Sequence, residues 1–182
     1  MRLGVMCSGN GTNFQNIVTN PVCNTNEVVL MIHNTKHCGA VKRAAKFGIP
    51  HVRVPHKEED QMIKLFETWR VDLIVLAGYM RVLKNPAAFP APIINIHPSL
   101  LPKYKGLHAI EQALDSGDDV TGVSVHYVNE ELDGGEIILQ QEVPILPDDD
   151  LESLTKAIQR VEYGILPAAI EHVKHQLQQQ TY

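Results

Sequence analysis

The predicted fold centres on the stretch Ile93-Ile94-Asn95-Ile96-His97-Pro98-Ser99-Leu100-Leu101-Pro102. The apolar beginning is typical of the end of a buried strand. Side chains alternate along a strand, so Asn95 and His97 are expected on one side of it. Pro98 favours extended geometry at His97. An amide and an imidazole are thus predicted at the carboxyl end of a strand, where open α/β sheets bind ligands, although both could simply satisfy a turn.

Alternating strand and helix patterns surround this stretch and predict an α/β fold. The sheet is expected to be doubly wound, mostly parallel and Rossmann-like, in a single domain over residues 1–182, with a hairpin-like, non-parallel member near its end. Strands are predicted at 3–6, 28–32, 51–54, 73–77, 93–96, 121–128 and 137–143, and helices at 14–18, 40–47, 58–69, 108–116 and from 150 onward, the last with a break near Gly164 and Pro167.

Composition excludes several classes of function. The 182 residues carry a formal net charge of −5, which gives no electrostatic argument for binding nucleic acid or a membrane surface. No apolar run is long enough to span a bilayer, and the first residues are too short a run for a secretory signal. The three cysteines lack C-x-x-C spacing, so a reduced, cytoplasmic setting is expected.

The first predicted strand leads into Ser8-Gly9-Asn10-Gly11-Thr12-Asn13 and then a helix. Such a turn offers backbone N–H groups and a helix N-terminus to a phosphate, and Thr12 and Asn13 are expected to cap the helix. The pattern is neither G-x-x-x-x-G-K-[ST] nor G-x-G-x-x-G, so it indicates neither a nucleoside triphosphate nor a dinucleotide. An ordinary strand–helix turn remains the alternative.

Asp133 adds a carboxylate to Asn95 and His97. A carboxylate near a histidine favours the imidazolium, and an imidazolium beside an amide can stabilise an oxyanion. No serine lies in a G-x-S-x-G elbow, so direct transfer between two bound substrates is favoured over a covalent intermediate. His97, His108 and His126 could form a three-histidine zinc site, but they fit no H-E-x-x-H pattern; no metal is predicted, and His126 is expected to be structural.

The order and spacing of four motifs resemble the phosphoribosylglycinamide formyltransferase family, whose members use folate in purine synthesis. The resemblance covers most of the chain. The Asn-x-His-Pro-Ser-Leu-Leu-Pro motif is common to the wider formyltransferase superfamily. The glycine turn narrows the resemblance to this one family. The motifs are Ser8–Asn13, Leu76-Ala77-Gly78-Tyr79-Met80-Arg81, Asn95–Pro102 and Glu131-Leu132-Asp133-Gly134-Gly135.

This resemblance implies transfer of a formyl group from the co-substrate N10-formyltetrahydrofolate to the amine of glycinamide ribonucleotide. It implies ribonucleotide binding in the N-terminal half, and folate binding and catalysis in the C-terminal half. Asn95, His97 and Asp133 would be catalytic. The ribonucleotide would contact Gly11, Thr12, Asn13, Gln159 and Glu162, and the folate would contact Met80, Arg81, Val82, Leu83, Asn95, Asn129, Glu130, Glu131, Leu132, Asp133 and, at its tail, Lys57.

Related activities are the alternatives. A methionyl-tRNA formyltransferase shares the central motif but normally adds a tRNA-binding domain and a basic surface. A formyltetrahydrofolate hydrolase replaces the amine by water and usually adds a regulatory domain. A folate- or nucleotide-binding module without turnover would not need the Asn95, His97 and Asp133 set. The expected partners are small molecules, and the chain is expected to be a monomer or a homodimer.

Overall fold

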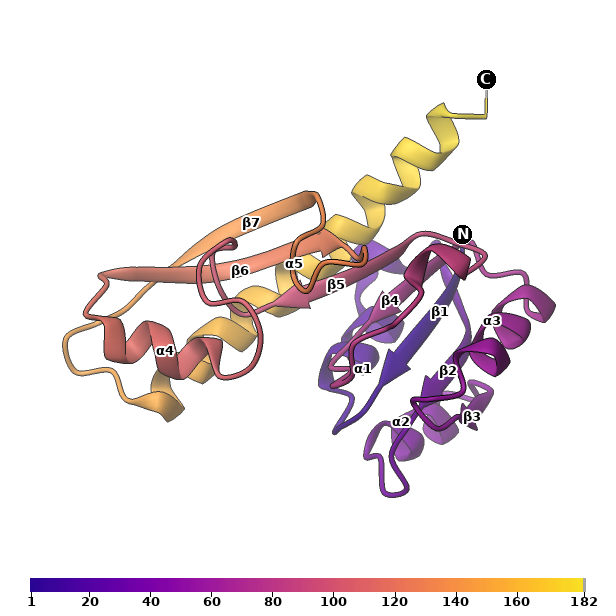
Figure 1. Cartoon of the computed structure of the whole chain (residues 1–182), viewed down its shortest axis with the longest axis horizontal. Coiled ribbons are helices and arrows are strands. Elements are labelled where there is room, and N and C mark those ends of the chain that lie inside the picture. The colour runs from indigo at the N-terminus through magenta and orange to yellow at the C-terminus, as the bar shows by residue number, and fades with distance from the viewer. Residues whose placement is uncertain (182) are drawn as a thin grey trace. The chain divides into compact units, whose positions relative to one another are not determined.

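The computed structural model describes residues 1–181, which form one seven-stranded sheet with helices (Figure 1). The strand order is β3-β2-β1-β4-β5-β6-β7. Parallel pairing joins β3, β2, β1, β4 and β5, and β6 pairs with β7 in the antiparallel sense. The predicted doubly wound, mostly parallel sheet is confirmed. The strands are β1 (Arg2–Cys7), β2 (Glu27–His33), β3 (His51–Arg53), β4 (Leu73–Leu76), β5 (Ile93–His97), β6 (Val120–Tyr127) and β7 (Ile137–Pro144).

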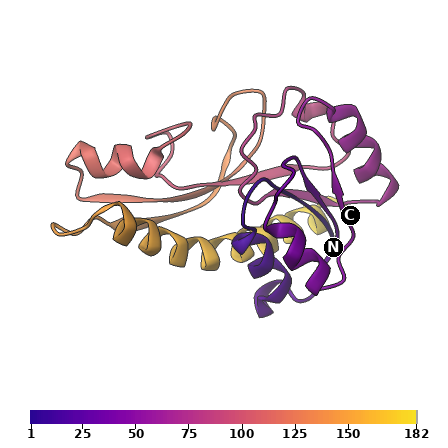
Figure 2. The same cartoon turned by 90° about the horizontal axis from the view of Figure 1, so that it is seen from below.

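The chain divides into two compact units, Met1–Asn95 and Ile96–Tyr182. In the first unit α1 and α2 cover one face of the sheet and α3 the other (Figure 2). The helices are α1 (Thr12–Thr19), α2 (Ala40–Lys46), α3 (Glu59–Thr68), α4 (Ala109–Ser116) and α5 (Leu151–Gln179), with short 3₁₀ turns at Pro21–Cys23 and Pro86–Ala88.

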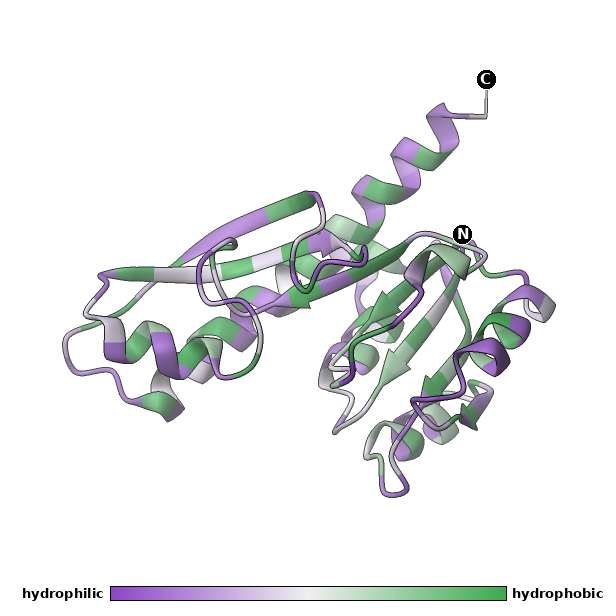
Figure 3. Cartoon of the chain, in the orientation of Figure 1, coloured by the Kyte–Doolittle hydropathy of each residue, from purple (hydrophilic) through white to green (hydrophobic). Residues whose placement is uncertain are grey.

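The core of the first unit lies along β1, β2 and β4, whose residues are mainly apolar (Figure 3). Every residue of β4 is buried, as expected for a central parallel strand covered on both faces. Gly4 lets α3 approach β1, because a Cβ atom there would lie 2.5 Å from a ring carbon of Phe66. Burial therefore holds the parallel strands in place. The loops that follow their carboxyl ends then lie together at one edge of the sheet.

In the second unit α5 packs against β6, β7 and α4. The predicted break near Gly164 and Pro167 is wrong, because α5 is continuous from Leu151 to Gln179. An internal proline costs a helix about 3 kcal/mol. Ile165, Leu166 and Ile170 are buried around it, and each fully buried side chain of this size contributes about 1.5–3 kcal/mol. Tertiary burial therefore outweighs the local penalty.

Candidate active site

The glycine turn after β1 leads directly into α1. Gly11 is the N-cap residue of α1 and has φ +78°, a left-handed conformation that favours glycine. A Cβ atom on Gly11 would lie 2.6 Å from the Cβ of Ala40, so α2 also requires glycine here. Because the helix begins at Thr12, the prediction that Thr12 and Asn13 cap it is wrong: both lie in its first turn. No side chain caps α1, so its first N–H groups point toward the turn.

Neighbouring loops hold this turn in place. The Ser8 hydroxyl donates to Oδ1 of Asn34 at 2.6 Å and accepts from the Met80 N–H at 2.8 Å. Arg43 of α2 donates from Nε to the Asn10 carbonyl at 2.7 Å and also donates to the Gln15 side chain. Sequence reasoning missed this role of Arg43, because nothing in the local pattern pairs it with a turn 33 residues earlier.

The segment after β4 carries the predicted folate contacts of the first unit. Met80 and Val82 each expose 63% of their surface, whereas Leu83 is buried. Desolvation, followed by the positive charges of Arg81, Lys57 and Lys84, lowers the pKa of His56. The predicted tail residue Lys57 and the predicted residue Arg81 therefore belong to one cationic group at the surface.

The Glu59 carboxylate anchors this segment on the start of α3. Its two oxygens accept the backbone N–H groups of Lys84 and Asn85 at 2.8 and 3.0 Å. The anchored loop keeps the cationic side chains at the same edge of the sheet as the glycine turn, to which the Ser8–Met80 hydrogen bond already connects it.

Asn95 and His97 occupy alternate positions at the end of β5, so their side chains leave the same face of the strand. The neighbouring strand pairs Leu76 with Asn95. His97 is 6% exposed and Asn95 is partly exposed. The predicted pairing of an amide and an imidazole on one strand end is therefore present.

Asp133 lies between two histidines. Its Oδ2 is 3.6 Å from Nδ1 of His97, and its Oδ1 is 3.6 Å from Nε2 of His126. Oδ2 also accepts the Gly106 N–H at 2.7 Å. All three side chains are more than nine-tenths buried, so their charges interact with little screening by water.

The charge of this carboxylate follows from its contacts. Burial alone raises the pKa of Asp133, but the neighbouring His126 ring, the hydrogen bond from Gly106 and the charge of His97 outweigh burial, so the pKa lies below its usual value of 3.8. Asp133 is therefore ionised near neutral pH. Separations of 3.6 Å exceed ordinary hydrogen-bond lengths, so each histidine contacts the carboxylate without a tight hydrogen bond, and each contact is an ion pair only when its ring is protonated.

The loop that carries Asp133 is shaped by its neighbours. Asn129 accepts the N–H of Glu131 at 2.9 Å, and Asp133 itself has φ +50°. A Cβ atom on Gly135 would lie 1.7 Å from the Tyr127 carbonyl oxygen, so only glycine fits there. Glu130 is exposed and Leu132 exposes half of its surface, which makes an apolar side chain available beside the carboxylate.

The two predicted ribonucleotide residues of the second unit lie on α5. Gln159 and Glu162 are three positions apart, which puts them on one face of the helix, and Gln159 is exposed. In the described part of the chain no group of three or more histidine, cysteine, aspartate or glutamate residues could hold a metal ion. Within residues 1–181 no helix is long and apolar enough to cross a membrane.

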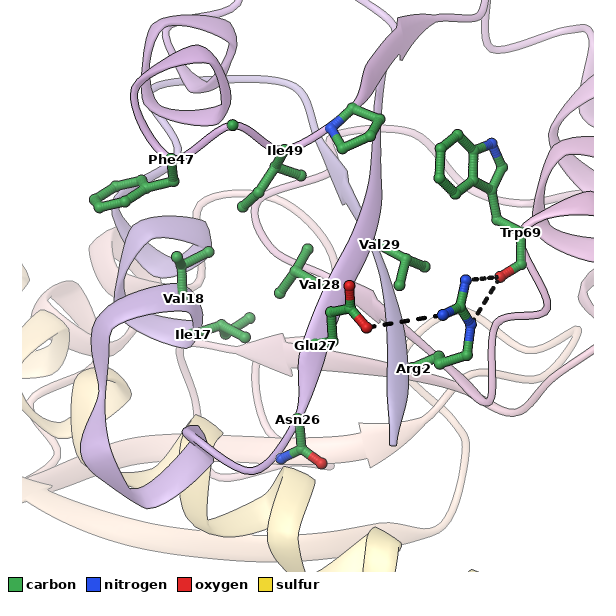
Figure 4. A pocket seen from close by; sticks show the side chains of 12 residues that line it. Arg2, Ile17, Val18, Asn26, Glu27, Val28, Val29, Phe47, Ile49 and Trp69 are labelled. Carbon is green, nitrogen blue, oxygen red and sulfur yellow. Dashed lines mark hydrogen bonds and ion pairs between the residues drawn. The ribbon is translucent and has the colours of Figure 1, made fainter.

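A cavity of about 370 Å³ opens elsewhere, beside the amino ends of β1 and β2 (Figure 4). Its walls include Ile17, Phe47 and Trp69, and the charged Arg2 is bonded to the Trp69 carbonyl and paired with Glu27. The residues that line it include none of those predicted to bind or react. Its position opposite the carboxyl edge separates it from the candidate site of this unit.

Comparison with known proteins agrees with this geometry. The family described as "Formyl transferase" matches residues 1–170. A phosphoribosylglycinamide formyltransferase of Haemophilus influenzae is 38% identical over 183 residues, covering 93% of this chain and 85% of its own length. The crystal structure of phosphoribosylglycinamide formyltransferase from Bacillus halodurans superposes with a TM-score of 0.88 at 38% identity, covering 94% of each chain.

A longer relative is similar as well. The "Trifunctional purine biosynthetic protein adenosine-3" of Drosophila melanogaster is 41% identical over 182 residues, which is 93% of this chain. The chain spans only 14% of the length of that protein.

Proposed function

Because the chain belongs to the formyl transferase family, and within it to the phosphoribosylglycinamide formyltransferases, we propose that it transfers a formyl group from N10-formyltetrahydrofolate to the amine of glycinamide ribonucleotide, a step of purine biosynthesis. The observation that carries the proposal is the position of Asp133, whose carboxylate faces Nδ1 of His97 on the strand that also carries Asn95. We propose one formyltransferase domain over residues 1–182.

The ribonucleotide phosphate binds at the glycine turn in this proposal. The backbone N–H groups at the start of α1, including those of Thr12 and Asn13, would attract an anion through hydrogen bonding and the helix dipole. Gly11 supplies the left-handed backbone that shapes this turn. Gln159 and Glu162 on α5 would contact the sugar or the glycine end.

The folate binds through the segments after β4 and β6. The exposed Met80 and Val82, with Arg81 and Leu83, offer an apolar surface to the pterin, as does Leu132 in the loop 129–133. The cationic group that includes Lys57 suits the carboxylates of the folate tail. In this proposal Asn95 and Asp133 would contact the formyl-bearing end of the folate.

The reaction begins when the amine nitrogen of the ribonucleotide attacks the formyl carbon. The carbonyl electron pair moves to oxygen, and the amide of Asn95 and the imidazolium of His97 stabilise the oxyanion. Collapse breaks the bond between carbon and N10 of the folate, and the proton lost by the amine ends on N10. A water held by Asp133 is the proposed relay for that proton, with His97 as the alternative.

One assay tests this function. The purified protein is mixed with N10-formyltetrahydrofolate, and release of tetrahydrofolate is followed with and without glycinamide ribonucleotide. We expect release only when the ribonucleotide is present, with its formylated form as the product. Ribose 5-phosphate, which lacks the amine, is the matched control. Release without any ribonucleotide would instead indicate a hydrolase, and no release under any condition would indicate a binding module.

A further inference from the structure

We propose that His126 is a positioning residue that holds the Asp133 carboxylate in the orientation that serves His97. This inference rests on the proposed function, since it concerns the same site. His126 lies inside β6, is 2% exposed, and is not among the residues expected from the sequence to react or bind. Its ring reaches the one oxygen of Asp133 that neither His97 nor Gly106 contacts.

The strand itself aims this ring. The pairing of β6 with β7 shifts register next to His126, because Val125 pairs with Leu139 and His126 pairs with Ile137. The extra residue lies in β7, so β6 continues without interruption through His126. Nδ1 of His126 lies 2.9 Å from the Tyr127 carbonyl oxygen. A carbonyl can only accept, so Nδ1 carries a proton and Nε2 is the nitrogen that faces Asp133.

Asp133 needs a second anchor. The Gly106 N–H fixes Oδ2 at 2.7 Å, but one hydrogen bond leaves the carboxylate free to rotate about that oxygen. His126 lies on Oδ1 at 3.6 Å and thereby limits this rotation. Nε2 of His126 makes no hydrogen bond within residues 1–181, so the ring acts by occupying the space beside Oδ1, and Oδ2 stays directed at Nδ1 of His97.

The two rings also share one negative charge. Because Nδ1 of His126 is already used, Nε2 can donate to the carboxylate only in the imidazolium form, and the neutral form would direct a lone pair at it. Asp133 faces His126 directly, and His97 lies across the same carboxylate. The two rings therefore approach one carboxylate from opposite oxygens, and a change in the position of either ring changes what the other one faces.

Two conservative variants separate this role from a merely structural one. The amide nitrogen of glutamine can replace Nε2, whereas that of asparagine can replace Nδ1 and keep only the contact to Tyr127. We expect His126→Gln to retain kcat within about threefold. We expect His126→Asn to lose at least about tenfold in kcat with both KM values nearly unchanged, because small misplacements of catalytic groups cost up to about 100-fold. Equal activity, or a more active His126→Asn, would overturn the inference.

A double variant tests whether His126 acts through Asp133. In an Asp133→Asn background, His126→Asn should cause little further loss of kcat, because the carboxylate that it positions is gone. Losses that multiply independently would overturn the proposal. His33 is the control for folding: it is also buried, its Nδ1 lies 3.0 Å from a carbonyl, and it faces no part of this cluster. His33→Asn should leave kcat unchanged.

A measurement independent of turnover separates failure of this inference from failure of the proposed function. The ring nitrogens of His97 are followed by NMR as pH is varied, in the wild-type protein and both His126 variants. We expect the His97 titration to shift in His126→Asn and to stay closer to wild type in His126→Gln. Identical curves in all three proteins would overturn the inference even if formyl transfer is observed.

Discussion

Nε2 of His97 lies 2.8 Å from the backbone carbonyl oxygen of Tyr104. Since that carbonyl can only accept, Nε2 carries a proton, and Nδ1 is the nitrogen whose protonation changes. Nδ1 faces Asp133 at 3.6 Å, a separation that leaves its proton uncommitted to a tight hydrogen bond. Of the two ring nitrogens, Nδ1 is therefore the one whose proton is less tightly held.

Removing either donor to the oxyanion should slow turnover greatly. We expect Asn95→Ala and His97→Ala each to lower kcat by about 10²–10³, the usual cost of losing one such donor. Thermal melting should change little for the partly exposed Asn95. Single-turnover kinetics measure the chemical step directly. Normal turnover in either variant would remove that residue from the mechanism.

Asp133→Asn should change both activity and the dependence of stability on pH. The folded-state pKa of Asp133 is lowered, so its contribution to stability is present above the unfolded pKa near 3.8 and is lost as pH falls through the folded value. The difference in Tm between wild type and Asp133→Asn should therefore shrink on acidification below about pH 4. An unchanged profile of kcat against pH would contradict the role of its charge beside His97.

A side chain on Gly11 should weaken ribonucleotide binding selectively. Gly11→Val places a β-branched residue at φ +78° and drives its Cβ atom against Ala40 of α2, which displaces the glycine turn, so we expect a higher KM for the ribonucleotide and an unchanged KM for the folate. Gly9→Ala is the control in the same turn, because no atom lies within 4 Å of its Cβ position. Equal weakening of both substrates would argue against separate sites.

Arg43 should matter through its contacts rather than its charge alone. Its bonds to Asn10 and Gln15 fix the glycine turn, so Arg43→Met should raise the ribonucleotide KM by about tenfold, the size expected for losing a charged hydrogen bond. Lys42→Met removes the same charge from the exposed neighbour and should have a much smaller effect. Isothermal titration calorimetry measures the affinity of both variants for the ribonucleotide. Similar losses of affinity in the two variants would refute the role given to the Arg43 contacts.

The two adjacent glycines after Asp133 should respond differently to alanine. Gly135→Ala drives a Cβ atom into the Tyr127 carbonyl, which is backbone and cannot yield, so Tm and kcat should both fall. In Gly134→Ala the new Cβ atom meets only the flexible Glu131 side chain, so Tm and kcat should change little. Circular dichroism melts compare the two. A stable, active Gly135→Ala would show that the loop can move without loss of function.

The sequence predicted most of the fold because strands and helices leave local patterns of apolar and capping residues. The continuous apolar run at 73–77 predicted a strand, and β4 is a buried parallel strand at this place. A helix was expected from residue 150 onward, and Asp150 and Ser153 form a capping box at its start. The break at Pro167 was wrong because burial against the rest of the second unit is not visible in local propensity.

The candidate site was predictable only in part. The family predicted from the four motifs is confirmed, and the expected approach of Asp133 to His97 is present. The roles of these residues stay predictions. His126 was expected to be structural, because a histidine within a strand gives no sign of facing a carboxylate on a later loop. That relationship depends on how the loop folds back against β6, which tertiary contacts such as that between Asp133 and Gly106 determine.

The Ser8 hydroxyl has a mechanical consequence. One oxygen atom bridges the backbone following β4 and the asparagine following β2, and it sits at the root of the turn following β1. Displacing any one of these three loops breaks a hydrogen bond that holds another, so removal of this single hydroxyl should disturb all three loops together.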